Sequence, residues 1–372
     1  MIVKLKDVVS RVNNNIDRFN TDIEYYLGKG HGECGEIAIT ERGNLKKDVG
    51  MLGFKFHFAF EPGDSLFFSR SFALRKAGMA MYTGICSDST YILRTKDINV
   101  LLPDYLPAII QSDVFWEYCD THHTGGVNFL INWSTLADYE FELPTIAEQK
   151  VLADKLWAAY RLKESYKKLL VATQEMVKSQ FIEMFKDKEP NGKISDLVDT
   201  DIKSVKKSFS KDDSIEYIDI SSVDAMNRSI KETTQHVVHS APSRAQQCVV
   251  KGDILVSTVR PVNRNIALIN RNLLNLVAST GFCVLRPKAN YREYLLSIVT
   301  SDKFTDKMCD IASGGLYPAV NNGDVLSYEI FIPDEETLNR VTSIYQQADK
   351  SEFELRKSIE SIDAVIKSLI NS

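Results

Sequence analysis

Two stretches of the chain show the hydrophobic spacing of long paired helices. After Pro144, and again after Pro333, apolar side chains recur at steps that alternate between three and four residues. Such spacing, sustained over several heptads, predicts a coiled coil rather than a helix that covers one side of a domain. The expected seam of the first helix is Leu152, Leu156, Ala159, Tyr166, Leu170, Thr173 and Val177, and that of the second is Val341, Tyr345, Ala348, Leu355, Ile359, Ile362, Ile366 and Leu369.

The two predicted helices are in matching register at a constant offset, 189, which takes Leu152 to Val341. Each seam position of the first helix falls on a seam position of the second, and polar Lys163 falls on polar Glu352. We therefore expect the helices to pack on each other in an antiparallel pair, which buries both seams. Pro190, followed by Asn191 and Gly192, is a stop signal that ends the first helix.

The segments that precede the two helices repeat at the same offset. Their matching anchors are Asp64 with Asp253, Ser112-Asp113-x-Phe115 with Ser301-Asp302-x-Phe304, Gly125-Gly126 with Gly314-Gly315, Asn132 with Asn321, and Tyr139-Glu140 with Tyr328-Glu329. Small insertions shift the offset locally, so that Leu93-Arg94 matches Leu285-Arg286 at 192. Between the anchors the copies differ strongly. Matching anchors with different residues between them predict two versions of one fold that present different surfaces.

Short strands and short helices alternate inside each copy. Strands are predicted at 65–68 and 91–93 in the first copy, and at 215–220, 253–259 and 281–285 in the second, where β-branched and aromatic residues are frequent. Helices are predicted within 105–119, 291–299 and 304–308. The predicted fold class is α+β, with two similar globular α/β domains separated by two long antiparallel coiled-coil helices and related by a pseudo-two-fold internal repeat. The expected boundaries are 1–144, 145–188, 189–333 and 334–372.

Composition limits the function classes without choosing among them. Apolar residues make up 44% of the chain and charged residues 26%, as in ordinary globular proteins. We expect a soluble, cytoplasmic protein without a membrane segment, because no apolar stretch is long enough to span a bilayer and the first residues resemble no signal peptide. The net charge of −5 does not indicate a nucleic-acid partner, so a DNA-binding hypothesis must rest on local charge.

One segment of the second copy is locally basic. Between residues 244 and 292 there are eight basic residues and one acidic residue, Asp253. Arginine and asparagine are the side chains that pair with guanine and adenine edges, so the loop after the strand at 253–259 is a candidate DNA-binding segment. A solvated basic surface is the alternative. The candidate residues are Arg260, Asn263, Arg264 and Arg271, with Arg70, Arg75 and Lys76 in the corresponding stretch of the first copy.

Paired glycines mark a second candidate DNA-binding loop in each copy. Gly125-Gly126 and Gly314-Gly315 follow a predicted helix, and Tyr317 lies just beyond the second pair. Glycine permits positive φ and lets the backbone approach a partner closely. A tight turn without a binding role is the alternative interpretation.

Several of these segments together resemble the specificity subunits of type I restriction–modification systems. The resemblance covers the whole chain as domain, helix, domain, helix. Its motifs are Phe141-Glu142-Leu143-Pro144 with Glu148-Gln149, the segment 179–185 that ends the first helix, and Ser313-Gly314-Gly315 followed by Val325 and Ile332-Pro333. One departure is that Glu148-Gln149 falls on Thr337-Leu338 at the repeat offset.

The resemblance implies a role in phage defence. Each recognition domain would read one half of a bipartite, asymmetric site in double-stranded DNA, with the helix pair setting the spacing. Two methyltransferase subunits would dock on the chain and methylate adenine with S-adenosylmethionine. Restriction subunits would add ATP- and Mg-dependent translocation and cleavage. The chain itself would carry no cofactor, no metal and no catalytic residue.

Other chemical signals in the sequence are weak. Gly30 to Gly35 fits a dinucleotide-binding pattern but has no strand–helix context. Asp104 with Glu148 and Lys150 mimics a nuclease constellation, and His122-His123 near Cys119 lacks further metal ligands. No phosphate-binding P-loop and no methyltransferase motif occurs. Two alternatives stay open: a coiled-coil adaptor that binds protein, and a fused restriction or methylation enzyme.

Overall fold

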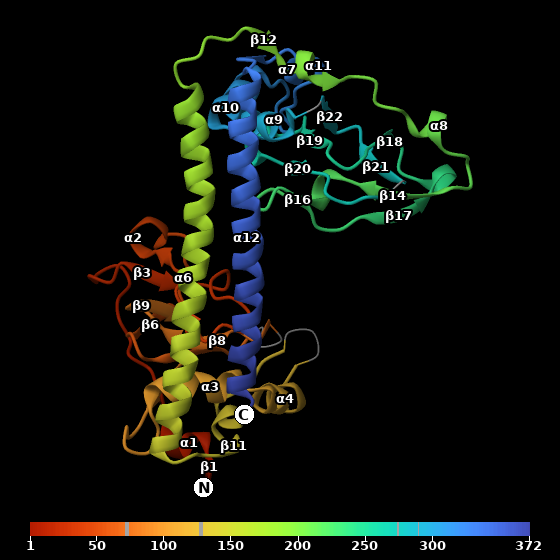
Figure 1. Cartoon of the computed structure of the whole chain (residues 1–372). Helices are drawn as coiled ribbons and strands as arrows, with labels where there is room; N and C mark the ends of the chain where they lie inside the picture. The colour runs from red at the N-terminus through yellow and green to blue at the C-terminus, as the bar shows by residue number, and fades with distance from the viewer. Residues whose placement is uncertain (71–73, 126–128, 274, 289) are drawn as a thin grey trace. The chain divides into compact units, whose positions relative to one another are not determined.

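The computed structural model describes the whole chain except residues 71–73, 126–128, 274 and 289. The chain divides into two compact units, Met1–Leu169 with Leu355–Ser372, and Leu170–Glu354. Each unit therefore contains one globular part together with a segment of both long helices, α6 (Ile146–Phe185) and α12 (Glu335–Ile370) (Figure 1).

Within each unit the two long helices pack against each other through the seam. In the first unit Lys163 Nζ lies 2.6 Å from Asp363 Oδ1. In the second, Gln174 Nε2 donates to Glu352 Oε2 at 3.1 Å. Eleven residues separate the two α6 positions and eleven separate the two α12 positions, in opposite directions, so the pairing is antiparallel and keeps one register. All of the predicted seam residues are buried or half-buried.

The two polar pairs of the seam are related by the internal repeat. At the repeat offset, Lys163 corresponds to Glu352 and Gln174 corresponds to Asp363. Each pair therefore joins the same two repeat positions, with the roles of the helices exchanged. The same pairing thus recurs in both units, as the hydrophobic pattern predicts, and the predicted fold class is confirmed.

The first unit is built on a mixed sheet flanked by a smaller one. The strand order in the larger sheet is β2 (Val9–Val12), β10 (Thr90–Thr95), β7 (Ser65–Phe68), β8 (Ala77–Ala80), β4 (Ala38–Ile39). The order in the smaller sheet is β5 (Gly43–Asn44), β3 (Tyr25–Leu27), β9 (Gly84–Ser87), β6 (Phe56–Phe60). Strands β1 (Ile2–Lys4) and β11 (Glu140–Glu142) pair separately. The helices are α1 (Leu5–Val8), α2 (Leu45–Asp48), η2 (Pro103–Tyr105), α3 (Leu106–Gln111), α4 (Asp113–His122) and α5 (Trp133–Ala137).

The second unit also has two larger sheets, but their outer strands differ from those of the first unit. The order in its first sheet is β13 (Val198–Asp199), β22 (Phe282–Pro287), β19 (Ile254–Ser257), β20 (Ile266–Leu268). The second sheet has the order β17 (Thr234–Val237), β14 (Ser214–Ile218), β21 (Leu276–Ser279), β18 (Ala245–Cys248). Two small pairs are β12 (Gly192–Lys193) with β23 (Glu329–Ile330), and β15 (Val223–Asp224) with β16 (Ser229–Ile230). The helices are α7 (Ile194–Leu197), α8 (Val205–Ser208), η3 (Ile220–Ser222), η4 (Val238–Ser240), η5 (Pro261–Asn263), α9 (Arg292–Val299), α10 (Asp302–Ile311) and α11 (Asn322–Leu326).

The central strands of the two units keep the same partners and the same register. Ser65 of β7 pairs with Met79 of β8, and Ile254 of β19 pairs with Leu268 of β20, so both members shift by the repeat offset. All four residues of β7 and of β19 are buried, which explains why each strand has three consecutive apolar residues rather than an alternating pattern.

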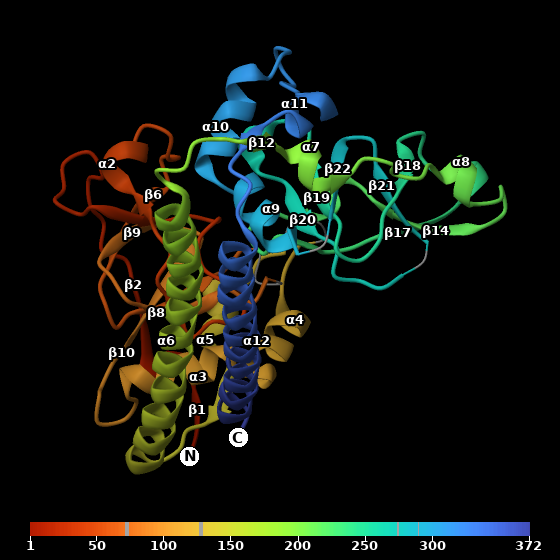
Figure 2. The ribbon, with the colours of Figure 1, turned by 45° about the horizontal axis from the view of Figure 1, so that its top comes forward.

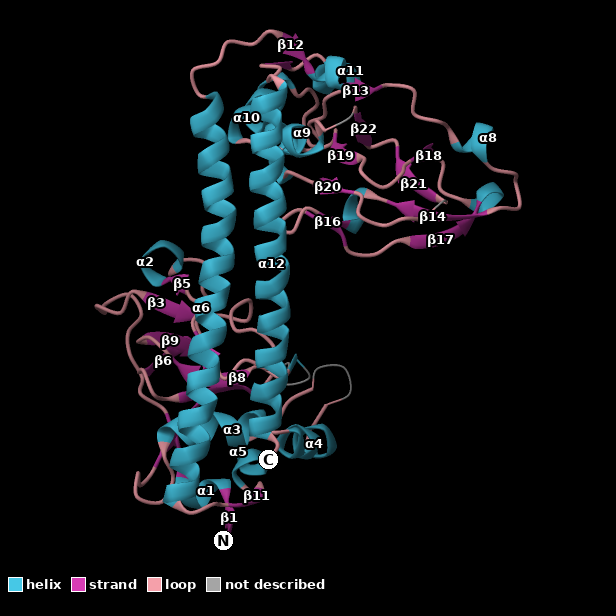
Figure 3. Cartoon of the chain, in the orientation of Figure 1, coloured by secondary structure: helices cyan, strands magenta, loops and turns pink. Residues whose placement is uncertain are grey.

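Each globular part packs on its segment of the long helices. In the first unit Met79 of β8 and Ala108 of α3 join Leu156, Trp157 and Ile366 in one apolar cluster, consistent with the position of β8 and α3 beside the helices in Figure 2. In the second unit α9 and α10 lie against α12, where Val341 is buried (Figure 3). The seam pattern alone does not predict the second buried face of α6, which carries Ala153, Trp157 and Tyr160.

A buried aspartate–arginine fork occurs in both units. Arg94 Nε and Nη2 donate to the two carboxylate oxygens of Asp64 at 2.6 and 2.8 Å. Arg286 makes the same two bonds to Asp253 at 2.9 and 2.8 Å. The fork explains two sequence anchors at once, namely the repeated aspartate and the Leu-Arg pair at the shifted offset.

Candidate nucleic-acid interface

The candidate loop of the second unit begins where β19 ends. Thr258 donates its backbone N–H to the Gly281 carbonyl at 2.9 Å, and Val259 forms an isolated β-bridge with Ala319. Arg260 then adopts left-handed backbone angles (φ 49°, ψ 68°) and turns the chain into η5. Arg264, which ends η5, also has left-handed backbone angles, with φ 50°. The loop is thus closed by two arginines in an uncommon conformation.

The glycine-containing loop lies directly against this first loop. Ser313 and Ala319 exchange backbone hydrogen bonds at 3.0 and 2.9 Å, which close the loop at its base. Gly314 has φ 110°, and a Cβ there would lie 3.0 Å from the Tyr317 carbonyl oxygen. A left-handed, crowded position of this kind explains why the sequence has glycine there.

Arg260 joins the two loops into one surface. Its backbone N–H donates to the Pro318 carbonyl at 2.8 Å, and its Nη2 donates to the Leu316 carbonyl at 3.3 Å. The guanidinium carbon lies 4.4 Å from the centroid of the Tyr317 ring. Stacking on an aromatic face leaves other N–H groups of an arginine free to donate at the edge. The loop pair therefore presents a cationic donor beside an exposed aromatic ring.

The surface of this loop pair is apolar as well as basic. Leu316 is 82% exposed, Val262 66% and Tyr317 63%. Asn263, at the end of η5, is also exposed. Exposed apolar and aromatic groups next to arginine suit contact with base edges and thymine methyls, and equally suit a protein surface.

In the first unit the described residues at the bases of the two corresponding loops make the same backbone contacts. Arg70 forms the isolated bridge with Leu130 that corresponds to Val259 and Ala319. Thr124 and Leu130 exchange backbone hydrogen bonds at 2.9 and 3.0 Å, and Gly125 has φ 95°. Gly126 lies outside the described residues. The structure thus brings Arg70 and the Gly125 loop together, as it does Arg260 and the Gly314 loop.

Other predicted candidates have partners within the protein. Arg75 pairs with Asp113 at 3.4 Å, and Arg264 pairs with Asp302 at 2.6 Å. Lys76 Nζ donates to the carbonyls of Lys29 and His31. Arg271 donates to the carbonyls of Ile230 and Lys231, at the opposite end of β20 from Arg264.

The local basic excess predicted from the sequence is smaller in the folded chain. Asp253 neutralises Arg286, Glu293 pairs with Arg292, and Asp302 pairs with Arg264. Glu293 and Asp302 lie just outside the window 244–292, so a count along the chain misses them. The Asp253 carboxylate holds the pKa of Arg286 above its usual range, and Lys178 together with Arg264 lowers the pKa of Asp302.

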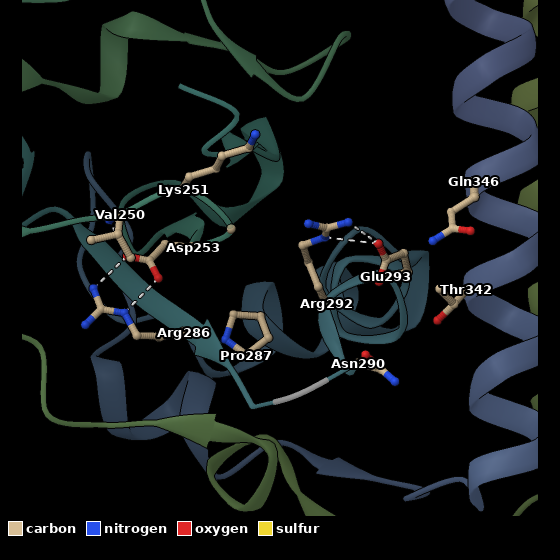
Figure 4. Close-up of a pocket in the computed structure, with 11 residues that line it drawn as sticks. Val250, Lys251, Asp253, Arg286, Pro287, Asn290, Arg292, Glu293, Thr342 and Gln346 are labelled. Atoms are coloured by element: carbon tan, nitrogen blue, oxygen red, sulfur yellow. Dashed lines mark hydrogen bonds and ion pairs between the residues drawn. The ribbon is translucent and has the colours of Figure 1, made fainter. Parts of the chain in front are cut away.

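A polar cavity in the second unit is lined by several members of the same basic run (Figure 4). Arg286 borders it from β22, Arg292 from α9 and Lys251 from the turn before β19. Thr342 and Gln346 border it from α12. Its arginines are those already paired with Asp253 and Glu293. Two of its three cations are therefore neutralised, and none of the residues that line the cavity belongs to the Arg260 loop.

Two residues that sequence reasoning did not place at the site are important to it. Asp113 and Asp302 were visible only as repeat anchors in the Ser-Asp-x-Phe motif. In the structure the serine hydroxyls of Ser112 and Ser301 accept the backbone N–H of Phe115 and Phe304, both at 3.2 Å. Asp113 and Asp302 form ion pairs with the loop residues Arg75 and Arg264. The motif therefore joins a helix cap, an ion-pair partner and a core residue.

Among the described residues, no group of three or more His, Cys, Asp or Glu side chains is arranged to hold a metal ion. No helix in the described part of the chain is long and apolar enough to cross a membrane.

The fold and the loop pairs define a class of protein: two α+β units, each packed on a segment of two long helices, with loop sequences that differ between the units. No protein-family model matches the chain. Over 158 residues, 41% of its length, the chain is 30% identical to the HindI type I restriction enzyme specificity subunit of Haemophilus influenzae. The match spans about a third of that relative, 34% of its length.

Solved structures extend the likeness to the whole chain. The type I restriction–modification system S subunit from M. genitalium has a TM-score of 0.55 at 12% identity, covering 100% of this chain and 94% of that one. A chain from a study of complex assembly and conformational transition of the type I R-M system gives 0.57 at 13%, covering 100% and 96%. The chain therefore has the fold of type I restriction–modification specificity subunits, and the resemblance predicted from its motifs is confirmed.

Proposed function

We propose that this chain is the sequence-specific DNA-recognition subunit of a type I restriction–modification complex. Each unit reads one half of a bipartite, asymmetric site in double-stranded DNA, through the loop pair that follows β7 or β19. The observation that carries the proposal is the recurrence of this loop pair on one conserved frame with different side chains. Two readers with unlike loops suit a site whose halves differ in sequence.

The proposal assigns the chemistry to partner subunits. Two methyltransferase subunits dock on the chain and use S-adenosylmethionine to methylate adenine, and restriction subunits supply ATP- and Mg-dependent translocation and cleavage. The chain itself contributes binding and spacing and has no catalytic role. Sequence similarity to a specificity subunit supports this division.

The test is selection of DNA by the full-length chain. A randomised duplex library is incubated with the purified chain, alone and together with a co-expressed type I methyltransferase subunit, and bound duplexes are sequenced. We expect a split motif with an unspecified spacer. Arg260→Ala should relax one half only, because that residue belongs to the second unit, and replacement of 191–333 by another recognition unit should change the same half.

The outcomes separate the proposal from its rivals. Enrichment of one contiguous motif, or loss of both halves in Arg260→Ala, contradicts two independent readers. Adenine methylation by the isolated chain would indicate a fused enzyme instead.

A protein-binding adaptor is the second candidate. The observation that favours it is the apolar part of the loop surface, with Leu316, Val262 and Tyr317 largely exposed in the second unit and Leu74 and Phe129 partly exposed in the first. An adaptor would enrich no DNA sequence, and Arg260→Ala would leave its partner binding nearly unchanged while Leu316→Asp would abolish it.

A further inference from the structure

Arginines in the candidate loops have backbone angles that side-chain-bearing residues rarely adopt. Among the described residues, the non-glycine residues with positive φ are all arginines, namely Arg75, Arg228, Arg260 and Arg264. A side chain at positive φ is strained, and glycine or asparagine would relieve that strain. Arg75 and Arg264 occupy the same repeat position in the two copies, with φ 47° and 50°. A strained residue that recurs in both copies indicates that its side chain is needed.

Both of these side chains reach the same partner position. Arg75 Nη1 lies 3.4 Å from Asp113 Oδ1, and Arg264 Nη1 lies 2.6 Å from Asp302 Oδ1, each across 38 residues of chain. Asp113 and Asp302 are the first residues of α4 and α10. The N-terminus of a helix stabilises a carboxylate, which fixes the position of the acceptor.

The same aspartates contact the ends of the long helices. Asp302 Oδ2 lies 2.8 Å from Lys178 Nζ, near the C-terminal end of α6. The backbone N–H of Asp113 donates to Asn371 Oδ1 at 2.7 Å, just after α12. Within each unit the candidate loop is thus linked, through one aspartate, to the long helix that ends in that unit.

We propose that Arg75 and Arg264 are positioning residues that anchor the two DNA-reading loops to the long helices, and that they do not read bases. This inference rests on the proposed function. Arg264 closes η5 opposite Arg260, so the ion pair with Asp302 sets the direction in which Arg260 and Asn263 are presented. A guanidinium held by a carboxylate has fewer donors left for DNA.

The test uses the full-length chain and the duplex that it selects. Affinity and its dependence on salt are measured for Arg264→Ala, Asp302→Ala, the double alanine variant, and the charge swap Arg264→Asp with Asp302→Arg. Arg264→Gly relieves the backbone but removes the ion pair, and Arg75→Ala is the matched variant of the other unit. Thermal unfolding of every variant shows whether it folds.

We expect Arg264→Ala and Asp302→Ala each to weaken binding on the order of tenfold, with the double variant no weaker than either single one, because the pair acts as a unit. The charge swap should recover most of the affinity. Arg264→Gly should bind as weakly as Arg264→Ala. The salt slope should stay that of the original chain, because no phosphate contact is lost. Arg75→Ala should relax the other half-site.

The opposite pattern overturns the inference. If Arg264 contacts DNA, Asp302→Ala will bind as tightly as the original chain or more tightly, the swap will not recover binding, and the salt slope will fall by about one unit. Failure of the proposed function looks different, because the unaltered chain would then select no duplex and Arg260→Ala would have no effect to compare.

Discussion

Asp64 and Asp253 are carboxylates removed almost completely from water, at 2% and 1% exposure, and a single arginine meets each charge. Each carboxylate also accepts a hydrogen bond from a backbone N–H, that of Glu61 for Asp64 and that of Val250 for Asp253, both at 2.9 Å. A buried charge is tolerated only when it is paired and hydrogen-bonded. The repeated aspartate is therefore a structural residue, and its recurrence does not indicate catalysis.

The pair of hydrogen bonds to Asp253 requires a cation with two parallel N–H donors. Arg286→Lys keeps the charge but cannot donate two parallel hydrogen bonds to Asp253. We expect the free energy of unfolding to fall by about 2 kcal/mol. Urea unfolding measures this loss, with Arg271→Lys as a control that touches only backbone carbonyls. Equal stability of the two variants would show that the fork contributes little.

Two adjacent glycines offer a matched pair of substitutions. Gly314 has φ 110° and a Cβ site 3.0 Å from a carbonyl oxygen, whereas a Cβ at Gly315 would meet nothing within 4 Å. Gly314→Ala should destabilise the loop by about 1–2 kcal/mol and weaken DNA binding, because the left-handed backbone is strained for alanine. Gly315→Ala should change both far less. Thermal unfolding and duplex affinity test the pair, and similar effects at both positions would contradict the strained-turn interpretation.

At the scale of elements, the seam of α6 and α12 contains one strongly buried lysine. Lys163 is 6% exposed and contacts both Asp363 and Glu36. Burial alone would lower the pKa of Lys163, but hydrogen bonds and charge from Asp363 and Glu36 outweigh it, so the pKa is raised. The lysine therefore stabilises the folded chain in its charged form.

Removing this lysine takes away the cation beside Asp363 and, among the described residues, leaves Glu36 with Lys167 alone, at 3.5 Å. Lys163→Met should lower the free energy of unfolding by about 3 kcal/mol. A raised lysine pKa contributes stability that is complete below the ordinary pKa of about 10.5 and is lost only as the pH rises through the higher folded value. The loss should thus be the same at neutral and moderately alkaline pH. Exposed Lys168→Met is the control, and a loss that vanishes at neutral pH would contradict this account.

The elements that sequence reasoning located best are those fixed by local pattern. The seam of α6 and α12 follows from periodicity, and β7 and β19 follow from apolar runs. Side-chain pairs across many residues do not follow, because nothing in periodicity states that Arg264 meets Asp302 or that Arg286 meets Asp253. The same limit made the basic run look more highly charged than it is. Whether Arg260 and Tyr317 bind DNA remains a prediction.

At the scale of the whole molecule, the constant repeat offset makes α6 a substitute for α12. A chain that ends at Lys188 has no α12, and its exposed seam is complementary to that of a second copy, with Lys163 of one copy beside Gln174 of the other. We expect residues 1–188 to form a homodimer, measured by light scattering. Leu170→Asp in the seam should give monomers, whereas Lys168→Asp on the exposed face should not. A stable monomer of the unaltered half would contradict the exchange of helices.

The register of the seam also bears on how a chain with two repeats can be assembled from one. Because the two polar pairs of the seam join the same two repeat positions, each half of the chain carries both sides of its own pairing surface. A chain of half the length would need no other gene product to close that surface, because two identical copies would suffice. Joining two such copies in one chain frees each copy from identity with the other, so that one loop surface can change while the other is kept. The sequences beside Gly125 and Gly314 differ in this way.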